Sequence, residues 1–557
     1  MQNSAVFVNA ATPAVISGSA ADTATINPAQ RSAASSAMMP RILNMRACYG
    51  GTETMRQMGE TFLPRFRRES KERWQDRLDQ TACTNKLREA VDSASAKPFR
   101  NLVSLKNAPE SLNNWAWNAD GCGRHLHIIG HRFFNEAVLT GIGYILVDHP
   151  TTTTLPNLKA QREENPQPFL RQIRAEDMLG AYYEKVKGEY SCVHARISSS
   201  RTQFNRNTFS EQVIDQVYVI EPGIVQVWER ARTNAFQVPP MLADGGSIAT
   251  AYPIDVRYQP YGIGVASGAA WELVSEYTQD LDRVPLVHMV AGDEEANMVV
   301  RPVFQDLAYK QQEHWRSTSE QRNILSSARF PMLASSGVEI DENGPEGEGF
   351  EVGPWVVLTS PDPQGRWYFV EPKGNAIEAG AKDIASIEYQ MDMMALNPVQ
   401  ATNRQYVPQN ERSLAETRVN SVVHDLAIGC QDALQKAVCY AGMWTGEDYS
   451  KVGVNLNFNF SGTDELAGKI GSVLDAVAKG VLSREGALNE LVRLNLLTED
   501  FDIKSELARA SAQAEMQLRT AIDNQPGGSG RGAADPAKPP KSERDFPAGQ
   551  TRPTAQH

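Results

Sequence analysis

Residues 303–444 constrain the fold more than any other part of the chain, because they hold three long helical patterns in a fixed order. The first helix is predicted over 303–328. One face of it carries several polar side chains where a core helix would carry apolar ones; this face consists of Phe304, Leu307, Gln311, His314, Thr318 and Leu325. Such a face is unusually polar for a helix in one closed core.

Two further helices follow along the chain. One is predicted over 375–396, where Asn375 and Glu378 have the spacing of a capping box, and the Asn-Pro pair after it ends the helix. The next is predicted over 413–444 and would be about 45 Å long at the rise of an α-helix.

The segments that join these helices differ from each other in composition. Between the first and second helix, residues 329–374 contain strand-like runs at 330–333, 355–358 and 367–370, with an acidic, glycine-rich loop among them. This predicts a β-containing insert. Between the second and third helix, residues 398–412 are polar, hold two prolines and include two arginines. Long loops with ends fixed by rigid helices are often functional.

The chain before residue 303 mixes helices and strands. Residues 41–150 show helical spacing and finish in a buried strand near 141–147. Residues 151–290 are β-rich, and two apolar runs in 217–228 surround a Glu-Pro-Gly turn, which predicts a hairpin. A further strand is predicted at 284–290. The fold class is therefore predicted to be α+β.

The two ends of the chain have compositions typical of disorder. Residues 1–40 are rich in Ala, Ser and Thr, and residues 524–557 are rich in Pro, Gly and charged residues. Neither end buries enough apolar surface to offset the entropy of ordering it, so both are predicted to be disordered. Between the third long helix and the tail, a strand is predicted at 454–460 and short helices are predicted over 463–520.

Charge and cysteine usage limit the partners and the compartment. The formal net charge is −12, and an acidic chain does not coat nucleic acid by neutralising phosphates. The six cysteines form no Cys-x-x-Cys pair, which favours free thiols in a reducing compartment. The chain shows neither a signal peptide nor an apolar stretch long enough to span a bilayer, so we expect it to be made in the cytoplasm.

Candidate catalytic and metal-binding motifs are weak, and the chain is not expected to be an enzyme. The best metal candidates are His125, His127 and His131, yet these three do not converge on a regular helix. The glycine pairs lack the spacing of a dinucleotide site, and there is no Walker A motif or nucleophile elbow. The acidic loop 341–351 does not follow calcium-loop spacing. No cofactor is predicted, and a metal-dependent hydrolase using the three histidines is kept as the enzymatic alternative.

Several short motifs, taken in order, resemble those of bacteriophage portal (head-to-tail connector) proteins over roughly residues 45–520. They are Gly51-Thr52-x-x-Met55-Arg56, Val138-x-x-x-Gly141-x-Gly143-Tyr-Ile-Leu-Val-Asp148, Arg283-Val-Pro285-Leu-Val-His288 and Ala328-Arg-Phe330-Pro331. The series of helix, β insert, helix, loop and long helix adds to the resemblance. Another phage structural protein, such as a capsid or tail component, is the second alternative, although two long helices around a β insert are not expected there.

The resemblance implies a ring of subunits, usually twelve, around a DNA channel at one capsid vertex. In such a ring, the polar face of helix 303–328 would pack against neighbouring subunits and a wet channel. The resemblance divides the chain into a wing 41–300, a stem helix 303–328, a clip 329–374, a second stem helix 375–396, a channel loop 398–412, a long wing helix and strand 413–462 and a crown 463–520. The predicted disordered leader 1–40 and disordered tail 524–557 depart from the family pattern.

The function implied by the resemblance is a conduit for packaging and ejection of double-stranded phage DNA. The implied partners are further copies of the chain, the terminase large subunit, head-tail adaptors, the major capsid protein and scaffold. The implied location is the virion, after assembly in the bacterial host cytoplasm. The residues expected to face DNA are Gln400, Asn403, Arg404, Gln405, Tyr406, Gln409, Asn410 and Arg412. Those expected to form the clip docking surface are Glu342, Glu346, Glu348, Glu351, Trp355 and Trp367.

Overall fold

The structure is a computed structural model that divides the chain into two units, Met1–Phe460 and Ser461–His557. Both units are described separately below. The structure describes residues 26–150, 166–231, 270–329, 332–336, 363–370, 375–395, 409–460, 463–493, 497 and 501–523. Helices and sheets both contribute, which makes the fold α+β as predicted.

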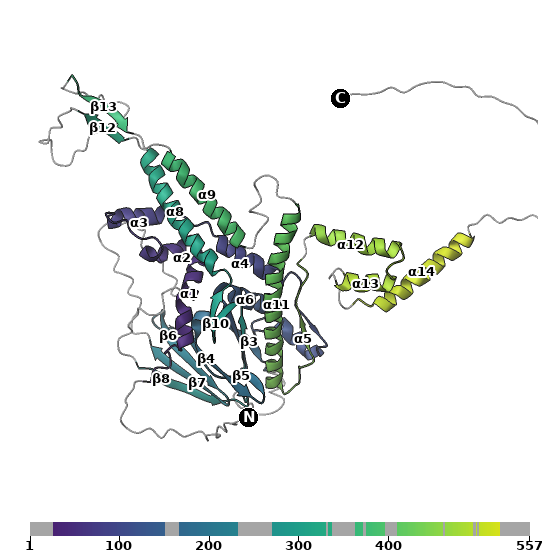
Figure 1. Ribbon diagram of the computed structural model, residues 1–557. Coiled ribbons are helices and arrows are strands. Elements are labelled where there is room, and N and C mark those ends of the chain that lie inside the picture. Colours follow the sequence, from purple (N-terminus) through teal and green to yellow (C-terminus); the bar gives the residue numbers. More distant parts are fainter. Residues whose placement is uncertain are drawn as a thin grey trace, which may run out of the picture. The chain divides into compact units, whose positions relative to one another are not determined.

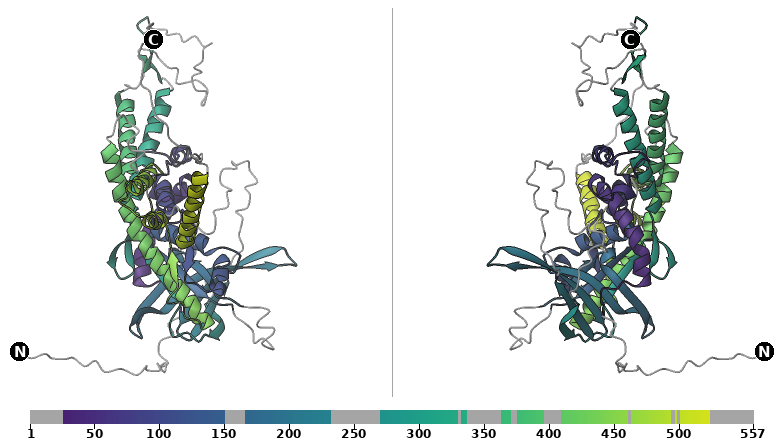
Figure 2. Two further views of the ribbon diagram at one scale, coloured as in Figure 1. Left: turned by 90° about the vertical axis from the view of Figure 1, so that its right-hand side faces the viewer. Right: turned by 90° about the vertical axis from the view of Figure 1, so that its left-hand side faces the viewer.

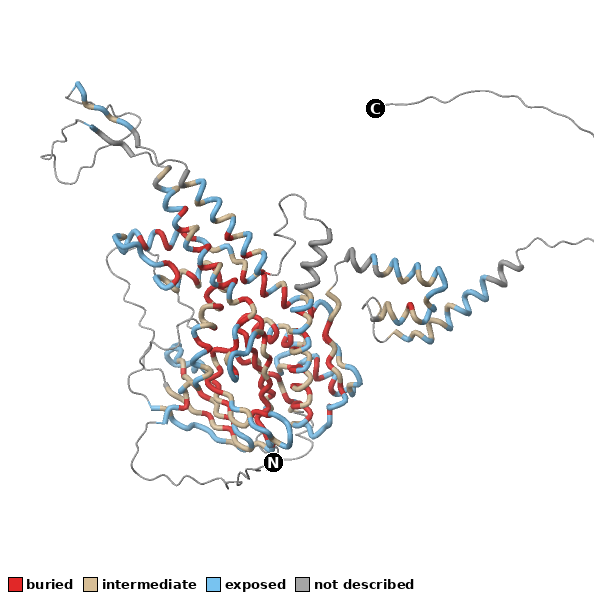
Figure 3. The backbone as a smooth tube through the Cα atoms, viewed as in Figure 1, coloured by how far each residue is buried: buried red, intermediate tan, exposed pale blue. Residues whose placement is uncertain are grey.

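The first unit begins with a group of helices (Figure 1). They are α1 (Ala33–Gly50), α2 (Thr52–Gln57), the 3-10 turn η1 (Gly59–Thr61), α3 (Lys71–Gln80), α4 (Lys86–Ala96), α5 (Glu110–Trp117) and α6 (Leu126–Thr140). Apolar side chains from α1, α4 and α6 meet in one core. Figure 3 shows this core as the buried centre of the unit.

Helix α1 corrects the prediction that residues 1–40 are disordered. It begins at Ala33, and Met38 and Ile42 on it are buried. Its start is fixed because Ser32 caps the helix with its side chain and donates its backbone N–H to the carbonyl of Leu179 at 2.8 Å. The Ala/Ser composition concealed a helix that packs through every third or fourth residue, and Pro40 lies inside it.

A three-stranded antiparallel sheet lies beside these helices, in the order β3–β2–β9. Its strands are β2 (Ile142–Asp148), β3 (Phe169–Ile173) and β9 (Leu286–Val290). Gly141 ends α6 with a φ of 88°, a left-handed conformation that glycine adopts without strain, and the chain then enters β2. The predicted strands near 141–147 and 284–290 are therefore confirmed within about two residues.

A five-stranded antiparallel sheet forms the rest of the β-rich region, in the order β4–β5–β6–β7–β8. Its strands are β4 (Met178–Val186), β5 (Glu189–Asn205), β6 (Ser210–Glu221), β7 (Ile224–Ala231) and β8 (Glu272–Thr278), and the 3-10 turn η2 (Ala175–Asp177) precedes them. The predicted hairpin is confirmed, because β6 and β7 pair around Pro222-Gly223. A second core lies between this sheet, α1 and the three-stranded sheet.

Two short ribbons and a long helix complete the first unit apart from the helix pair described below. β10 (Gly292–Ala296) pairs with β11 (Val299–Pro302), and β1 (Ser104–Lys106) pairs with β14 (Gly453–Asn455). The predicted strand 454–460 is thus confined to its first residues. Helix α11 (Gln409–Thr445) packs against the three-stranded sheet through a row of small and apolar side chains, among them Ala427, Cys430, Leu434 and Ala437.

The second unit consists of α12 (Thr463–Ala478), α13 (Arg484–Arg493) and α14 (Ile503–Asp523) in its described residues. Neighbouring helices pack in the order α12, α13, α14. The predicted short helices over 463–520 are present, and α14 extends further than the predicted end. None of the described helices in either unit has an apolar stretch long enough to cross a membrane.

His288 makes the stability of the first unit dependent on pH. Burial, together with the charge of Lys436, lowers the pKa of His288 to about 4, and its ring lies against Tyr183 with centroids 4.8 Å apart. An unfolded histidine takes up a proton near pH 6.5. Between these two values the unfolded state binds more protons, so the free energy of unfolding should fall by up to about 3 kcal/mol as the pH drops from 6.5 to 4. In urea titrations, His288→Leu should remove this part of the pH dependence. A variant that keeps the wild-type slope would contradict the assignment.

Candidate functional site: the α8–α9 helix pair and its β insert

Two helices run side by side away from the sheets of the first unit (Figures 1 and 2). They are α8 (Gln305–Arg329) and α9 (Asn375–Met394), and beyond them lies a ribbon of β12 (Met332–Ser336) and β13 (Arg366–Val370). The two helices begin and end within two residues of their predicted bounds. The arrangement of helix, β insert and helix is therefore confirmed for the described residues.

Close approach of the backbones joins α8 to α9. Gln321 donates its side-chain N–H to the carbonyl of Ile377 at 2.8 Å. A Cβ on Gly380 would lie 2.0 Å from the Oε1 of Gln321, so a larger residue at this position would displace the Gln321 side chain. Nearer the body of the unit, Trp315 and Met391 are fully buried. A polar contact and an apolar core therefore fix the two helices against each other.

The polar face of α8 is buried inside the same chain, which corrects the expectation that it faces other subunits and water. Gln311 accepts the backbone N–H of Leu87 at 2.9 Å and donates to the carbonyl of Cys48 at 2.8 Å. His314, which is 2% exposed, contacts Glu388 on α9 at 3.2 Å. The face is polar because it satisfies backbone groups at the ends of α1 and α4 and pairs with α9.

The outward sides of the helix pair carry large apolar side chains. Tyr309 on α8 is 51% exposed, and Tyr389 and Met393 on α9 are 53% and 55% exposed. Figure 3 shows the exposed outer sides of both helices. Tyr389 and Met393 lie four residues apart and so share one face of α9. Grouped exposed apolar side chains are typical of protein contact surfaces.

The β insert holds a single member of the predicted docking surface within the described residues, Trp367. It lies on β13 opposite Ser335 and is partly buried, whereas its neighbour Tyr368 is half exposed. The strand predicted at 330–333 is displaced along the chain to β12. The other predicted strand, 355–358, lies outside the described residues, as do Glu342, Glu346, Glu348, Glu351 and Trp355.

The predicted channel loop is shorter than the sequence suggested. Helix α11 begins at Gln409, so the backbones of Gln409, Asn410 and Arg412 belong to its first turn and not to a loop. Residues 409–412 contain no helix breaker, which allows the helix to start before the capping pattern at Ser413. The remaining predicted loop residues, Gln400, Asn403, Arg404, Gln405 and Tyr406, lie outside the described residues.

The three histidines of the enzymatic alternative have structural contacts. His125 is the N-cap of α6, where its Nδ1 accepts the backbone N–H of His127 at 2.9 Å. His127 and His131 both lie edge-on to the ring of Phe99. Burial lowers the pKa of all three. The described residues contain no group of three or more His, Cys, Asp or Glu side chains placed to hold a metal ion.

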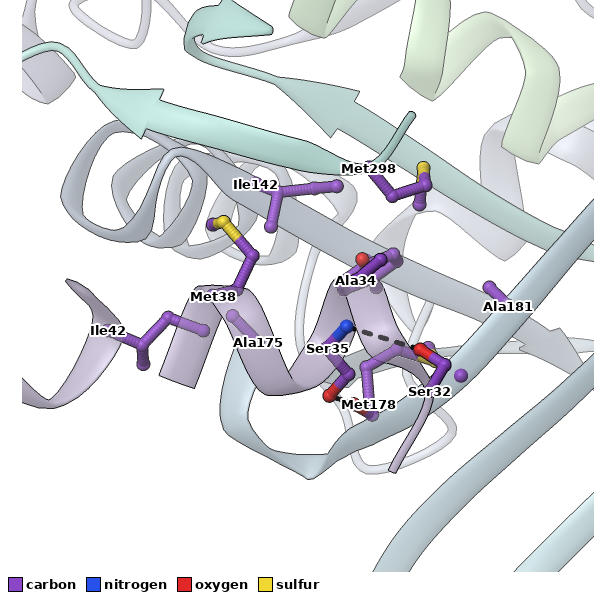
Figure 4. A pocket seen from close by; sticks show the side chains of 12 residues that line it. Ser32, Ala34, Ser35, Met38, Ile42, Ile142, Ala175, Met178, Ala181 and Met298 are labelled. Atoms are coloured by element: carbon purple, nitrogen blue, oxygen red, sulfur yellow. Dashed lines mark hydrogen bonds between the residues drawn. The ribbon is translucent and has the colours of Figure 1, made fainter. Parts of the chain in front are cut away.

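Two hollows in the described part of the chain are candidate substrate sites, one small and one large and open. A cavity of about 20 Å³ lies between α1 and the sheets, lined by Met38, Ile142 and Met298 among others (Figure 4). It can hold about one water molecule, too little for a substrate. An open hollow of about 640 Å³ lies on the five-stranded sheet near His194 and Trp228. His194 contacts Glu221 there at 2.8 Å. Neither hollow gathers a nucleophile with a base and an orienting group.

Comparisons with known proteins bear on part of the chain. A family model described as a domain of unknown function (DUF4055) matches residues 303–445, which contain α8, the β insert, α9 and α11. No curated protein matches the sequence. Among solved structures, a chain in the neck of the native gene transfer agent particle, computed with C12 symmetry, overlaps with a TM-score of 0.37 at 12% identity, covering 73% of this chain and 89% of that chain. A chain in the virion of the native particle gives a TM-score of 0.35 at 13% identity, with coverages of 74% and 89%.

Proposed function

We propose that the chain is a portal-type subunit, which forms a closed ring around a DNA channel at one vertex of a phage capsid. The observation that carries the proposal is the projecting pair α8–α9 with a β ribbon beyond it, followed by the long helix α11 that packs along the sheet. In the resemblance drawn from the sequence, these elements are the stem, the clip and the wing helix. The exposed apolar side chains Tyr389 and Met393 supply contact surface for neighbouring subunits.

The proposed role is passive, with DNA passing through the ring during packaging and ejection. A net charge of −12 favours sliding, because each phosphate contact adds salt-dependent affinity. The β insert would be the docking site for the terminase large subunit and for head-tail adaptors. Contacts with the major capsid protein and scaffold would hold the ring in the virion.

Images of the purified protein test the proposal directly. Negative-stain micrographs should show closed rings with an axial opening, and class averages should give the number of subunits, expected near twelve. A repeated contact between two different surfaces of the same chain either closes into a ring or continues as a filament, and the proposed function requires the ring. Monomers, or open filaments without a channel, would remove the proposed function.

The segment between α9 and α11, together with the first turn of α11, is proposed to touch the DNA. We expect the double variant Arg404→Ala/Arg412→Ala to assemble rings like the wild type but to package less DNA, because two cations that contact phosphates are lost. Packaging is measured as nuclease-protected DNA per particle, and ring assembly is measured by negative stain. Unchanged packaging in the double variant would rule out this segment as the DNA contact.

A further inference from the structure

A strongly basic surface segment interrupts this acidic chain. Residues 65–73, here called the basic loop, contain five cationic side chains in nine positions; they are Arg65, Arg67, Arg68, Lys71 and Arg73. All five are exposed. The segment leads into α3 and includes its first turn.

A buried ion pair holds the base of this loop. The guanidinium of Arg77 donates from Nε to Oε1 of Glu69 at 2.8 Å and from a terminal nitrogen to Oε2 at 2.7 Å. The two side chains are only 6% and 8% exposed. Arg77 also donates to the carbonyl of Pro64 at 2.9 Å. A two-point ion pair of this kind fixes both the position and the orientation of the two side chains.

Further contacts fix the backbone between the cations. The backbone N–H of Phe66 donates to Oε2 of Glu69 at 3.0 Å, and the Phe66 ring lies 4.2 Å from the guanidinium of Arg77. Ser70 caps α3 by accepting the N–H of Arg73 at 3.2 Å. The loop therefore has a fixed backbone from which the cationic side chains extend into solvent.

The five cations of the loop outnumber its two carboxylates, Glu69 and the exposed Glu72. Arg65 pairs with Glu60 at 2.8 Å. Among the described residues, Arg67, Arg68, Lys71 and Arg73 have no carboxylate within ion-pair distance. Like charges held close together repel, so this arrangement is destabilising unless an anion binds. A fixed backbone also lowers the entropy lost when an anion is bound.

We propose that the basic loop, residues 65–73, binds the phosphate backbone of double-stranded DNA. Phosphate contacts need cations and no apolar surface, whereas specific protein interfaces have an apolar centre. The only large apolar side chain in the loop is Phe66, whose ring lies against Arg77. Arginine, which provides four of the five cations, binds phosphate through two parallel N–H groups. The inference rests on the proposed function, which accounts for the presence of DNA. It adds a second DNA contact beside the one proposed for the segment between α9 and α11.

Fluorescence anisotropy with a labelled duplex of random sequence tests this site. The full chain should bind with an affinity that falls steeply as salt rises. In Arg67→Ala/Arg68→Ala, the slope of log affinity against log salt should be smaller by about 2, because each lost phosphate contact removes about 0.9. Affinity near 0.1 M salt should fall by at least tenfold, on the order expected from two contacts. The melting temperature should not fall, because both side chains are exposed and their removal lessens the repulsion among the cations.

The matched control removes two exposed cations elsewhere. Lys185 and Arg206 are exposed on the five-stranded sheet region, and Lys185→Ala/Arg206→Ala changes the net charge by the same amount. This control should keep the wild-type slope. Equal slopes for all three proteins, or no binding by the wild type at low salt, would overturn the proposal. A loop variant that loses ring assembly while keeping DNA affinity would also overturn it, in favour of an acidic protein surface as the partner.

Ring images of the same samples separate this inference from the proposed function. Closed rings with unchanged DNA binding in the loop variant would overturn the inference alone. DNA binding through the loop by a wild type that forms no ring would support the inference and remove the proposed function.

Discussion

Arg46→Met is expected to lower the free energy of unfolding of the first unit by about 3–5 kcal/mol, the usual cost of leaving a buried charge without its partner. Arg46 on α1 donates to Glu136 on α6 and, at 2.9 Å, to Glu176 in η2. The two carboxylates are 7% and 11% exposed. Burial opposes the charge of Arg46, but the two carboxylates outweigh it and raise its pKa above the ordinary value. Without the guanidinium, the buried Glu136 loses its cationic partner, while Glu176 retains Arg174 at 3.6 Å.

Urea titrations followed by circular dichroism, at one fixed protein concentration, measure this loss. Arg41→Met is the matched control, because Arg41 lies on the same helix and pairs with Glu295 at a more exposed position, 24% and 47% exposed. Exposed pairs contribute about 0–1 kcal/mol. Combining Arg46→Met with Glu136→Gln and Glu176→Gln should recover part of the loss, since the uncompensated charges disappear. Equal losses for Arg46→Met and Arg41→Met would contradict the assignment.

The long helices could be predicted closely because several local signals agree. Residues 375–394 have a polar N-terminus with capping-box spacing, apolar residues at steps of three and four, and a proline shortly after the end. The hairpin of β6 and β7 could be predicted equally well, because a glycine, Gly223, lies at the turn between two apolar runs and adopts a φ of 83° there. In both places the local sequence alone selects the conformation.

Predictions that depended on distant contacts were less accurate. The start of α1 is stabilised by the carbonyls of Glu176 and Met178, which accept hydrogen bonds from Arg31 and Ser35. Nothing near Ala33 in sequence reveals these partners. The same holds for β14, which ends at Asn455 although apolar and Asn residues alternate beyond it. Tertiary contacts decide both boundaries.

The candidate site could be predicted only in outline. The sequence located the helix pair and its insert, but it assigned the polar face of α8 to other subunits. Composition cannot distinguish a buried, hydrogen-bonded glutamine from an exposed one. The basic loop was missed because net charge was considered over the whole chain, although five cations in nine residues are visible in the sequence. The predicted loop and clip residues outside the described ranges remain predictions.

Gln311→Leu is expected to lower the free energy of unfolding by about 1–3 kcal/mol, because the buried N–H of Leu87 loses its acceptor and the carbonyl of Cys48 loses one of its two donors. Gln311 is fully buried, and its side-chain amide joins three helices. It binds the carbonyl of Cys48 in the last turn of α1 and the N–H of Leu87 in the first turn of α4. The N–H of Leu87, in the first turn of α4, has no acceptor inside its own helix, whereas the carbonyl of Cys48 also accepts the N–H of Gly51 at 3.2 Å. Leucine matches glutamine in size, so the loss reports hydrogen bonding more than packing.

Glu320→Leu, an exposed substitution on the same helix, serves as the control and should change the free energy of unfolding by less than about 0.5 kcal/mol. Gln311→Glu separates the two bonds, because a carboxylate can still accept from Leu87 but cannot donate to Cys48. It should also be destabilising, and more so as the pH rises, because the buried carboxyl group must then ionise. If Gln311→Leu were as stable as the wild type, the polar face of α8 would not be held by contacts within the chain. The alternative, that this face is free to pack against a neighbouring subunit, would then regain its support.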